Sequence, residues 1–400
     1  MKKILFVLEN YRDFLSQNAN CVRSIVKEMN GCEPFFLSVE YSNCEKHFDN
    51  EHVFCVTSKS RRNKLCNLFR KINKFFFMPI ENKRVVSKLI KAISALDLKH
   101  HFDLIIAVQN PCESTEAVAG YKKRNLKSCC CLYEIDPASN RYKNPHGLFQ
   151  KMWARRTQRW ELKRYVLFDY VIHMKTHARH FSNKVYLQFS KKTFFLDIPS
   201  FVVRNLFPSS KKNIELVLIY SGAFYPGLRE PNYMLRVLNK VYKMCSFRLD
   251  LFSGKTLSMQ NCRKIVTNCD NLYLHDFIEE SQLVSKVESA NFLISVGNID
   301  SDYLPSKIFF YMGFGKPIIH FAKDDSDVVV SYLNKYENSL IVFENDSFDD
   351  NCRRVISFLQ QSHSCLNLVD LYEKFFENTP KCSALFFEEL LKRSDCEKTN

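Results

Sequence analysis

The chain has 400 residues, of which 46% are hydrophobic and 25% charged, and its formal net charge is +15. This composition excludes an intrinsically disordered protein, and the length exceeds what one hydrophobic core usually serves, so two domains are expected. No apolar run approaches the roughly 20 residues needed to cross a bilayer. The apolar run at residues 4–8 is too short for a secretion signal, so we expect a first β-strand in a cytoplasmic protein.

Short apolar segments alternate with amphipathic ones along the whole chain. In the first half, strands are predicted at residues 3–8, 103–108, 128–133 and 170–174, and helices at 19–29 and 82–96. In the second half, strands are predicted at residues 215–221, 248–252, 272–274, 291–296, 317–321 and 340–343. Helices are predicted there at residues 232–242, 260–267, 281–289, 306–314, 327–335, 349–359, 367–376 and 380–392. Strands separated by helices of this length predict parallel sheets with right-handed crossovers.

A link between domains is predicted at residues 200–213, where Asn, Pro, Ser and Lys cluster. The predicted fold is α/β, with two doubly wound, Rossmann-like domains facing each other across a cleft. The first domain covers residues 1–205, the second covers 214–366, and residues 367–400 form C-terminal helices. Ligands of such sheets bind beyond the carboxyl ends of the strands, which places the site in the cleft.

Sixteen cysteines do not indicate a disulfide framework in a chain of this size without an export signal. Cys129, Cys130 and Cys131 are adjacent in a predicted strand, so their side chains alternate between faces and cannot converge on one metal. We interpret the cysteines as reduced, buried, small hydrophobes. A zinc or redox role is the alternative.

The positive charge is concentrated in two segments. Residues 59–99 hold twelve Lys or Arg against two acidic residues, and residues 151–164 hold six against one. Both segments also contain aromatic side chains: Phe69, Phe75, Phe76, Phe77, Trp153 and Trp160. Basic residues mixed with aromatics suit an anionic membrane surface. Nucleic acid and a solvated basic face are the alternatives, and we expect no nucleic-acid partner.

Common nucleotide and hydrolase motifs are missing from the sequence. The chain has nine glycines, and the loop after its first strand, residues 9–17, contains none, which argues against a nicotinamide dinucleotide fold. No P-loop, H-E-x-x-H or G-x-S-x-G motif occurs either.

The most informative stretch is residues 298–319 (NIDSDYLPSKIFFYMGFGKPII), which follows a predicted buried strand. Pro305 suits the first turn of a helix, and Gly315 is expected to end it. A helix that opens just beyond a parallel strand leaves backbone N–H groups free to bind phosphate. Lys307 lies in that first turn, where the helix dipole disfavours a cation unless an anion is bound. A solvated lysine on an exposed turn is the alternative.

The second half resembles the donor domain of a GT-B glycosyltransferase of the large retaining class, group 1 or family 4. The resemblance rests on residues 220–231 (YSGAFYPGLREP), 275–278 (HDFI) and 302–319, and residues 372–392 are similar to the helices that cross back to the first domain. In the N-terminal half, only the strand pattern and residues 133–137 (YEIDP) are similar to the acceptor domain.

The resemblance implies roles for individual residues. Arg229 and Lys307 would neutralise the donor diphosphate, with Gly222 in the glycine loop and Ser306 at the helix start. The loop that contains Phe277 and Ile278 would receive the nucleotide base. Exposed loop charge is the alternative for Arg229.

Members of that class carry two glutamates eight residues apart, and these positions read Asp302 and Phe310 here. The resemblance implies that Asp302 lies near the transferred sugar and that Asp136, just past a predicted strand end, approaches it from the acceptor side. A solvated loop acid is the alternative for Asp302, and an Asp that starts a loop before Pro137 is the alternative for Asp136. Phe310 cannot accept a hydrogen bond from the ribose, so the usual ribose contact is in doubt.

We therefore expect a cytoplasmic glycosyltransferase that moves a sugar from a nucleotide-diphosphate sugar to a glycan or lipid-linked saccharide, retaining and metal-independent, with no cofactor. It is expected to associate peripherally with the inner face of the membrane. The alternatives are a sugar-nucleotide 2-epimerase and a non-catalytic GT-B partner protein.

Overall fold

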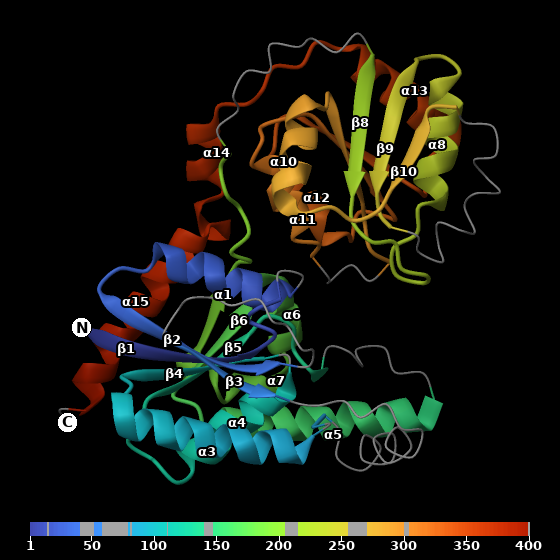
Figure 1. Ribbon diagram of the computed structural model, residues 1–400. Coiled ribbons are helices and arrows are strands. Elements are labelled where there is room, and N and C mark those ends of the chain that lie inside the picture. Colours follow the sequence, from blue (N-terminus) through green and yellow to red (C-terminus); the bar gives the residue numbers. More distant parts are fainter. Residues whose placement is uncertain are drawn as a thin grey trace. The chain divides into compact units, whose positions relative to one another are not determined.

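The computed structural model describes residues 1–13, 16–40, 52–57, 79–80, 82–109, 111–139, 147–204, 215–254, 270–299 and 304–398. The chain forms two compact units (Figure 1). Unit 1 is Met1–Pro199 with Pro380–Asn400, and unit 2 is Ser200–Thr379. Unit 2 thus begins at the first residue of the predicted link and keeps residues 367–379, and the C-terminal segment of unit 1 starts at Pro380.

Unit 1 contains a seven-stranded parallel sheet with the order β3-β2-β1-β4-β5-β6-β7. Its strands are β1 (Lys2–Glu9), β2 (Cys32–Glu40), β3 (Val53–Thr57), β4 (Leu104–Val108), β5 (Cys130–Glu134), β6 (Tyr170–Met174) and β7 (Thr193–Leu196). Its longer helices are α1 (Gln17–Glu28), α3 (Lys83–His100), α4 (Cys112–Lys122), α5 (Gly147–Tyr165) and α15 (Pro380–Lys398), with α6 (Ala178–Phe181) and α7 (Lys184–Leu187) between β6 and β7.

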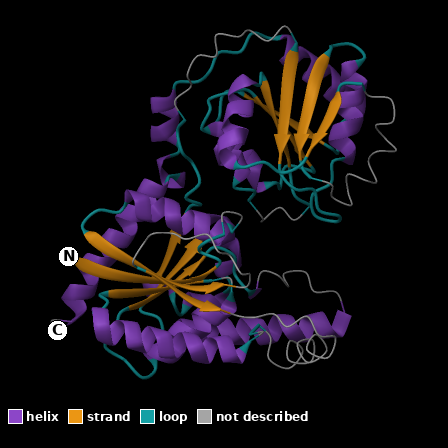
Figure 2. Ribbon diagram, viewed as in Figure 1, coloured by secondary structure: helices purple, strands orange, loops and turns teal. Residues whose placement is uncertain are grey.

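Helices cover both faces of this sheet (Figure 2). Alternate residues of the strands point to opposite sides, so Ile4 and Phe6 pack with α1 and α15, whereas Leu5 and Val7 contact the core beneath α3, α4 and α5. Phe387 of α15 lies in edge-to-face contact with Phe6. The C-terminal helix is therefore part of the core of unit 1.

Unit 2 contains a six-stranded parallel sheet with the order β10-β9-β8-β11-β12-β13. Its strands are β8 (Leu216–Ser221), β9 (Phe247–Phe252), β10 (Leu272–His275), β11 (Phe292–Val296), β12 (Ile318–Ala322) and β13 (Ser339–Phe343). Its helices are α8 (Asn232–Tyr242), α10 (Glu280–Ser289), α11 (Lys307–Met312), α12 (Val328–Leu333), α13 (Phe348–Gln360) and α14 (Leu368–Lys374).

In unit 2, α8 and α13 lie on one side of the sheet and α10, α11 and α12 on the other (Figure 1). The strand order reverses between β8 and β11, which is the topological switch point of a doubly wound sheet. The prediction of two doubly wound, Rossmann-like domains is confirmed. The carboxyl ends of β8 and β11 are therefore the expected ligand-binding edge of this sheet.

Some elements were not predicted, for identifiable reasons. Helix α4 is buried on nearly every side, so its sequence lacks the polar face that marks an amphipathic helix. Strand β2 begins with Cys32-Glu-Pro34, and this polar start, which includes a proline, obscures the strand pattern of the apolar residues after it. The predicted helix at 260–267 and residues 58–78 of the first basic segment lie outside the described residues.

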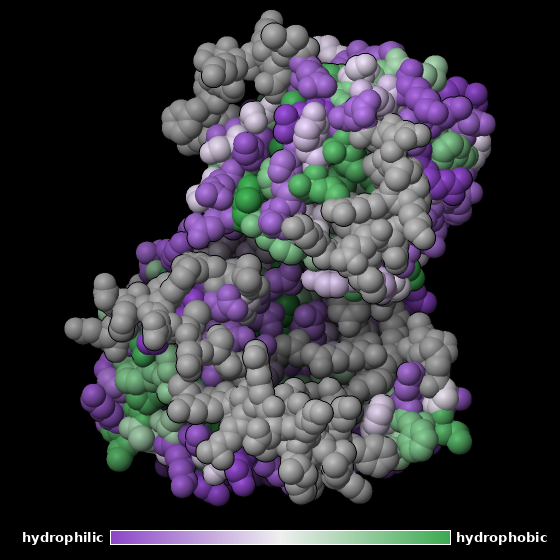
Figure 3. All heavy atoms as spheres, turned by 45° about the vertical axis from the view of Figure 1, so that its right-hand side comes forward, coloured by the Kyte–Doolittle hydropathy of each residue, from purple (hydrophilic) through white to green (hydrophobic). Residues whose placement is uncertain are grey.

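Cys130 and Cys131 are fully buried in β5, and burial raises the pKa of both thiols far above its usual value. This confirms their interpretation as small core hydrophobes. Every cysteine within the described stretches has a free thiol. Within the same stretches, no helix has an apolar length sufficient to span a bilayer. The visible face of the molecule carries many hydrophilic side chains with smaller hydrophobic areas among them (Figure 3).

Candidate functional site

The loop after β8 brings the backbone at Gly222 against two polar side chains. Gly222 has φ +153°, and a Cβ atom there would lie 3.2 Å from the Tyr220 hydroxyl and 3.8 Å from Arg229 Nη1. Burial raises the pKa of Tyr220 to about 12, and the nearby positive charge of Arg229 opposes that rise. Glycine tolerates this φ and leaves the Arg229 guanidinium close to backbone that carries no side chain.

Arg229 is held at the switch point by several hydrogen bonds. Its Nε donates to Asn298 Oδ1 at 2.9 Å, just beyond β11. Its backbone pairs with Tyr225 in both directions at 2.9 Å, and Ile299 N donates to Leu228 O at 2.7 Å. The loops after β8 and β11 are therefore joined, and the guanidinium is fixed at the carboxyl ends of the two central strands.

Helix α11 is tied to the same strand end by Tyr311. The Tyr311 hydroxyl, fully buried, accepts a hydrogen bond from Ser221 N at 2.6 Å. The helix spans Lys307–Met312 and is shorter than the predicted 306–314. Ile308 N and Phe309 N already donate to Pro305 O and Ser306 O at 3.1 Å. Fewer backbone N–H groups are thus free at this helix start than the sequence predicted. An anion bound here would be held mainly by side chains.

Lys307, the first residue of α11, is a partly buried charge. Its side chain is half-buried, and its ammonium lies 4.9 Å from the ring centre of Phe310. It makes no hydrogen bond or ion pair with any residue in the described parts of the chain. Burial lowers the pKa of Lys307, Glu280 opposes this effect, and Arg204 adds to it. Lys307 is therefore a partly desolvated cation that no acidic side chain pairs with among the described residues.

Lys316, nine residues later, is a useful contrast. It is 8% exposed, and burial lowers its pKa as well. Its ammonium, however, donates to Glu288 O and to Ala290 O, each at 2.6 Å. The fold thus supplies hydrogen-bond acceptors to the ammonium of Lys316, whereas the described residues supply none to that of Lys307.

A second cation, Arg204, also lies over Phe310. The Arg204 guanidinium carbon is 4.6 Å from the Phe310 ring centre, and Nη2 donates to Glu280 Oε1 at 2.6 Å. Its Nε is buried and has no hydrogen-bond partner among the described residues. Phe310, 8% exposed, therefore packs in the core and also contacts two cations through its ring. Its ring quadrupole attracts cations, but it cannot neutralise them as a glutamate would.

Arg204 reaches this position because residues 200–204 cross the end of α11. Arg204 N donates to Gly313 O at 3.0 Å. A Cβ atom at Gly313 would lie only 2.2 Å from Val202 O, so only glycine permits this approach. Sequence reasoning treated these residues as part of the link between domains and missed Arg204.

The predicted base-binding loop follows β10. Phe277 is 58% exposed, and its ring lies on Gly254, where a Cβ atom would be 2.7 Å from Phe277 Cε2. Ile278 beside it is half-buried. An exposed aromatic ring at the carboxyl ends of β9 and β10 offers a flat apolar surface of the kind on which a base stacks.

Of the two predicted catalytic acids, only Asp136 lies within the described residues. Asp136 follows β5 in unit 1, its carboxylate is 44% exposed, and Oδ1 lies 4.0 Å from His177 Nε2. Asp302 lies outside the described residues, as do residues 300–303 together. Of the predicted set, the structure brings Gly222 and Arg229 together, and it places Ser306 and Lys307 side by side at the start of α11.

No contact between Arg229 and Lys307 is recorded among the described residues, but Tyr311 links their surroundings. Tyr311 lies one turn after Lys307 on α11, and its hydroxyl is bonded to the strand end beside Gly222. Asn298 is a further site residue that sequence reasoning missed. Its signal was its position, as a polar residue two places after the end of a fully buried strand.

Unit 1 contains a buried acidic network that the sequence did not reveal. Glu134 and Glu161 are fully buried, and burial raises the pKa of each to about 8. Glu134 accepts a hydrogen bond from the Tyr165 hydroxyl at 2.5 Å and lies 2.8 Å from His173 Nδ1. Burial lowers the pKa of His173, so we assign both members of this pair as neutral.

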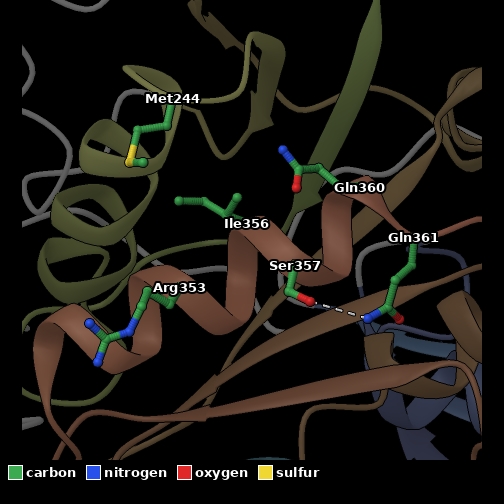
Figure 4. A pocket seen from close by; sticks show the side chains of 6 residues that line it. All are labelled: Met244, Arg353, Ile356, Ser357, Gln360 and Gln361. Carbon is green, nitrogen blue, oxygen red and sulfur yellow. Dashed lines mark hydrogen bonds between the residues drawn. The ribbon is translucent and has the colours of Figure 1, made fainter.

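A separate surface pocket lies between the ends of α8 and α13, with a volume of about 400 Å³. It is lined by Met244, Arg353, Ile356, Ser357, Gln360 and Gln361 (Figure 4). A helix that follows a parallel strand runs back along the sheet, so these helix ends lie at the amino ends of the strands. The pocket is therefore at the opposite edge of the sheet from Arg229.

No protein-family model matches the sequence, and no curated protein is similar to it. Solved structures do match. Sucrose-phosphate synthase from Thermosynechococcus elongatus has a TM-score of 0.65 and 13% identity, covering 99% of this chain and 100% of that one. A glycosyltransferase from Rickettsia africae has a TM-score of 0.63 and 12% identity, covering 98% of each chain.

A putative UDP-N-acetylglucosamine 2-epimerase from Listeria monocytogenes has a TM-score of 0.56 and 10% identity, covering 100% of this chain and 98% of that one. At such identities the matches show the fold. Together with the two Rossmann-like sheets, they establish that the chain has the GT-B fold seen in these glycosyltransferases.

Proposed function

We propose that the protein is a glycosyltransferase that moves a sugar from a nucleotide-diphosphate sugar to a glycan or lipid-linked saccharide. The observation that carries the proposal is Lys307, a half-buried cation with no hydrogen bond or ion pair in the described parts of the chain. A lysine kept in this state costs stability unless a ligand compensates it. A diphosphate would supply two negatively charged groups, one for Lys307 and one for Arg229.

In the proposed mechanism, the cations stabilise the leaving group. When the glycosidic bond to the nucleotide breaks, negative charge develops on the diphosphate, and fixed cations in a partly desolvated site stabilise that charge. Arg229 and Lys307 serve this purpose, with Ser306 as a hydrogen-bond donor. We propose that the reaction proceeds with retention, without a metal ion and without a cofactor. Phe277 and Ile278 would receive the base.

The acceptor side is proposed to use Asp136, and Asp302 is proposed to lie near the transferred sugar. Asp136 is the more testable of the two, because its carboxylate is exposed at a strand end and lies near His177. Asp136→Asn should lower turnover and leave the affinity for the nucleotide unchanged. The location that we propose is the cytoplasm, on the inner face of the membrane.

A thermal-shift screen with UDP, GDP, ADP and their sugars tests the proposal first. A ligand at about 100 times its Kd stabilises the protein by about 2.7 kcal/mol, and the matching nucleotide should therefore raise the Tm by several degrees. The matching sugar nucleotide is then incubated with saccharide acceptors, and both the nucleotide released and the anomeric configuration of the product are measured. If no nucleotide shifts the Tm, the proposal fails.

The second candidate is a sugar-nucleotide 2-epimerase, which the likeness to the Listeria monocytogenes structure supports. It differs in needing no acceptor. Incubation with UDP-N-acetylglucosamine alone, followed by NMR, would reveal the epimer. A non-catalytic GT-B protein is the third candidate, supported by Phe310 in the place of a carboxylate, and it predicts no turnover in either assay.

A further inference from the structure

The orientation of helix α5 in unit 1 is fixed by its inner face. Trp160 Nε1 donates to Glu116 Oε2 of α4 at 2.8 Å, and Arg164 binds both oxygens of the same carboxylate, at 2.6 and 2.8 Å. Thr157 and Tyr165 are buried on the same face. Because this face is held, the opposite face of α5 is turned outward permanently.

The outward face of α5 carries a row of positively charged side chains. Its exposed cations are Lys151, Arg155, Arg159 and Lys163. None of the four makes an ion pair within the described residues. The helix has one acidic residue, Glu161, which is fully buried and accepts hydrogen bonds from Ser139 N and the Tyr186 hydroxyl. The acid therefore does not offset the outer cations by direct pairing.

Large apolar side chains continue the same stripe toward the start of α5. Leu148 is 85% exposed and Met152 is 44% exposed. Positions 148, 152, 155, 159 and 163 are spaced by four, three, four and four residues, so they share one face of the helix. The stripe thus changes from apolar at its amino-terminal end to basic along the rest of its length.

Helix α3 adds cations on the same side of the sheet. It packs on the same core cluster as α4 and α5, and the three helices lie together in Figure 1. Its exposed cations without an ion pair in the described residues are Arg84, Lys88, Lys91 and Lys99. The charge of α5 is therefore reinforced by its surroundings.

We propose that the outer stripe of α5, formed by Leu148, Met152, Arg155, Arg159 and Lys163, docks on an anionic lipid bilayer. The cations would contact lipid phosphates, while the two apolar side chains enter the boundary between headgroups and acyl chains. A nucleic acid would satisfy the cations but would leave Leu148 and Met152 in water. The bilayer matches both halves of the stripe, and the proposal does not rest on glycosyl transfer.

Vesicle sedimentation of the full chain, without substrate, tests this proposal. Wild type should sediment with phosphatidylcholine vesicles that contain about 30% phosphatidylserine and remain in solution with pure phosphatidylcholine. Binding to the acidic vesicles should be largely lost in about 0.5 M NaCl, where charges are screened within a few ångströms. Equal binding to both vesicle types, or binding to neither, would overturn the proposal.

Two variants identify the surface. The double substitution Arg155→Gln with Arg159→Gln should weaken partitioning about 30-fold, since each cation contributes about a factor of five at an anionic surface. As a control, Lys240→Gln with Lys243→Gln removes the same charge from exposed positions in unit 2 and should leave partitioning nearly unchanged. Equal losses in the two double variants would show that net charge alone is responsible and would overturn the assignment to α5.

The apolar end of the stripe separates a bilayer from a soluble polyanion. Leu148→Ser with Met152→Ser keeps every charge and should still weaken vesicle partitioning about tenfold, because less apolar surface is buried. Unchanged vesicle partitioning in this variant would overturn bilayer docking. So would a wild-type protein that binds a double-stranded DNA oligonucleotide tightly and does not bind vesicles. Since all substituted positions are exposed, the Tm of each variant should match wild type and confirm folding.

Discussion

Replacing Lys307 with methionine should affect stability and nucleotide binding in different ways. Met has a similar length and no charge, so it removes the ammonium and keeps the packing against Phe310. The change removes a cation–π contact worth about 0.5–1 kcal/mol, and it also removes the cost of partly desolvating a charge. Because Lys307 makes no hydrogen bond in the described residues, these opposing terms should leave the free energy of unfolding within about 1 kcal/mol of wild type.

The affinity for a nucleoside diphosphate should fall clearly in the same variant. A charge-assisted hydrogen bond contributes about 1.5–3 kcal/mol, which corresponds to a roughly 10- to 150-fold increase in Kd. Denaturant unfolding measures the first quantity, and titration calorimetry with UDP, GDP and ADP measures the second. A variant that unfolds much more easily, or one that binds the nucleotide as well as wild type, would refute the reasoning.

Lys316→Met is the matched control for Lys307→Met. Lys316 donates two hydrogen bonds of 2.6 Å to backbone carbonyls, and both acceptors would lose this donor. The variant should lose about 2–4 kcal/mol of stability and keep its affinity for the nucleotide in the folded state. Lys307 would then be important for nucleotide binding, and Lys316 for the stability of the fold.

Three further predictions concern packing and pH. Phe310→Leu should lower the free energy of unfolding by about 1–3 kcal/mol, because it removes the ring beneath two cations. Phe310→Tyr keeps the ring and should retain most of the wild-type stability, and urea titration compares the two variants. Gly313→Ala should destabilise the protein by at least about 2 kcal/mol, because the new Cβ atom would meet the backbone carbonyl of Val202. Gly120→Ala is the control, since its Cβ atom would meet only the flexible end of the Ile90 side chain. In the same urea titration it should cost less stability. Burial raises the pKa of Glu161 from about 4.5 to about 8, so between these pH values the folded state keeps a proton that the unfolded state releases, and stability should fall as pH rises from about 4.5 to about 8. Glu161→Gln should flatten that fall; an unchanged pH dependence would mean that Glu161 is ionised in the folded protein.

Much of the fold could be predicted because both sheets are parallel and buried. Strands such as β11 read as continuous apolar runs, and the helices after them carry one polar face, so element type follows from periodicity. Prediction failed where burial removed the pattern. Helix α4 is enclosed by its neighbours, and a helix without a polar face does not show the 3.6-residue period.

The candidate site was predictable in part for a related reason. Gly222 and Arg229 follow a strand that the pattern identified, so their position at a strand end could be inferred. Arg204 could not, because its role depends on a backbone path across α11 that only Gly313 allows. Phe310 was recognised as a departure from a carboxylate, but its contacts with two cations depend on side-chain geometry that no spacing rule gives.

The central claim is that a nucleotide diphosphate binds unit 2 at the carboxyl ends of β8 and β11. Titration calorimetry of wild type and Arg229→Ala with the nucleoside diphosphate that gives the largest thermal shift tests it most directly. We expect one site per chain in wild type and a Kd at least about tenfold higher in the variant. Because the hydrogen bond to Asn298 is lost, the Tm of the variant without ligand should fall by a few degrees only. Equal affinity in the two proteins, or no binding of any nucleoside diphosphate to wild type, would contradict the claim.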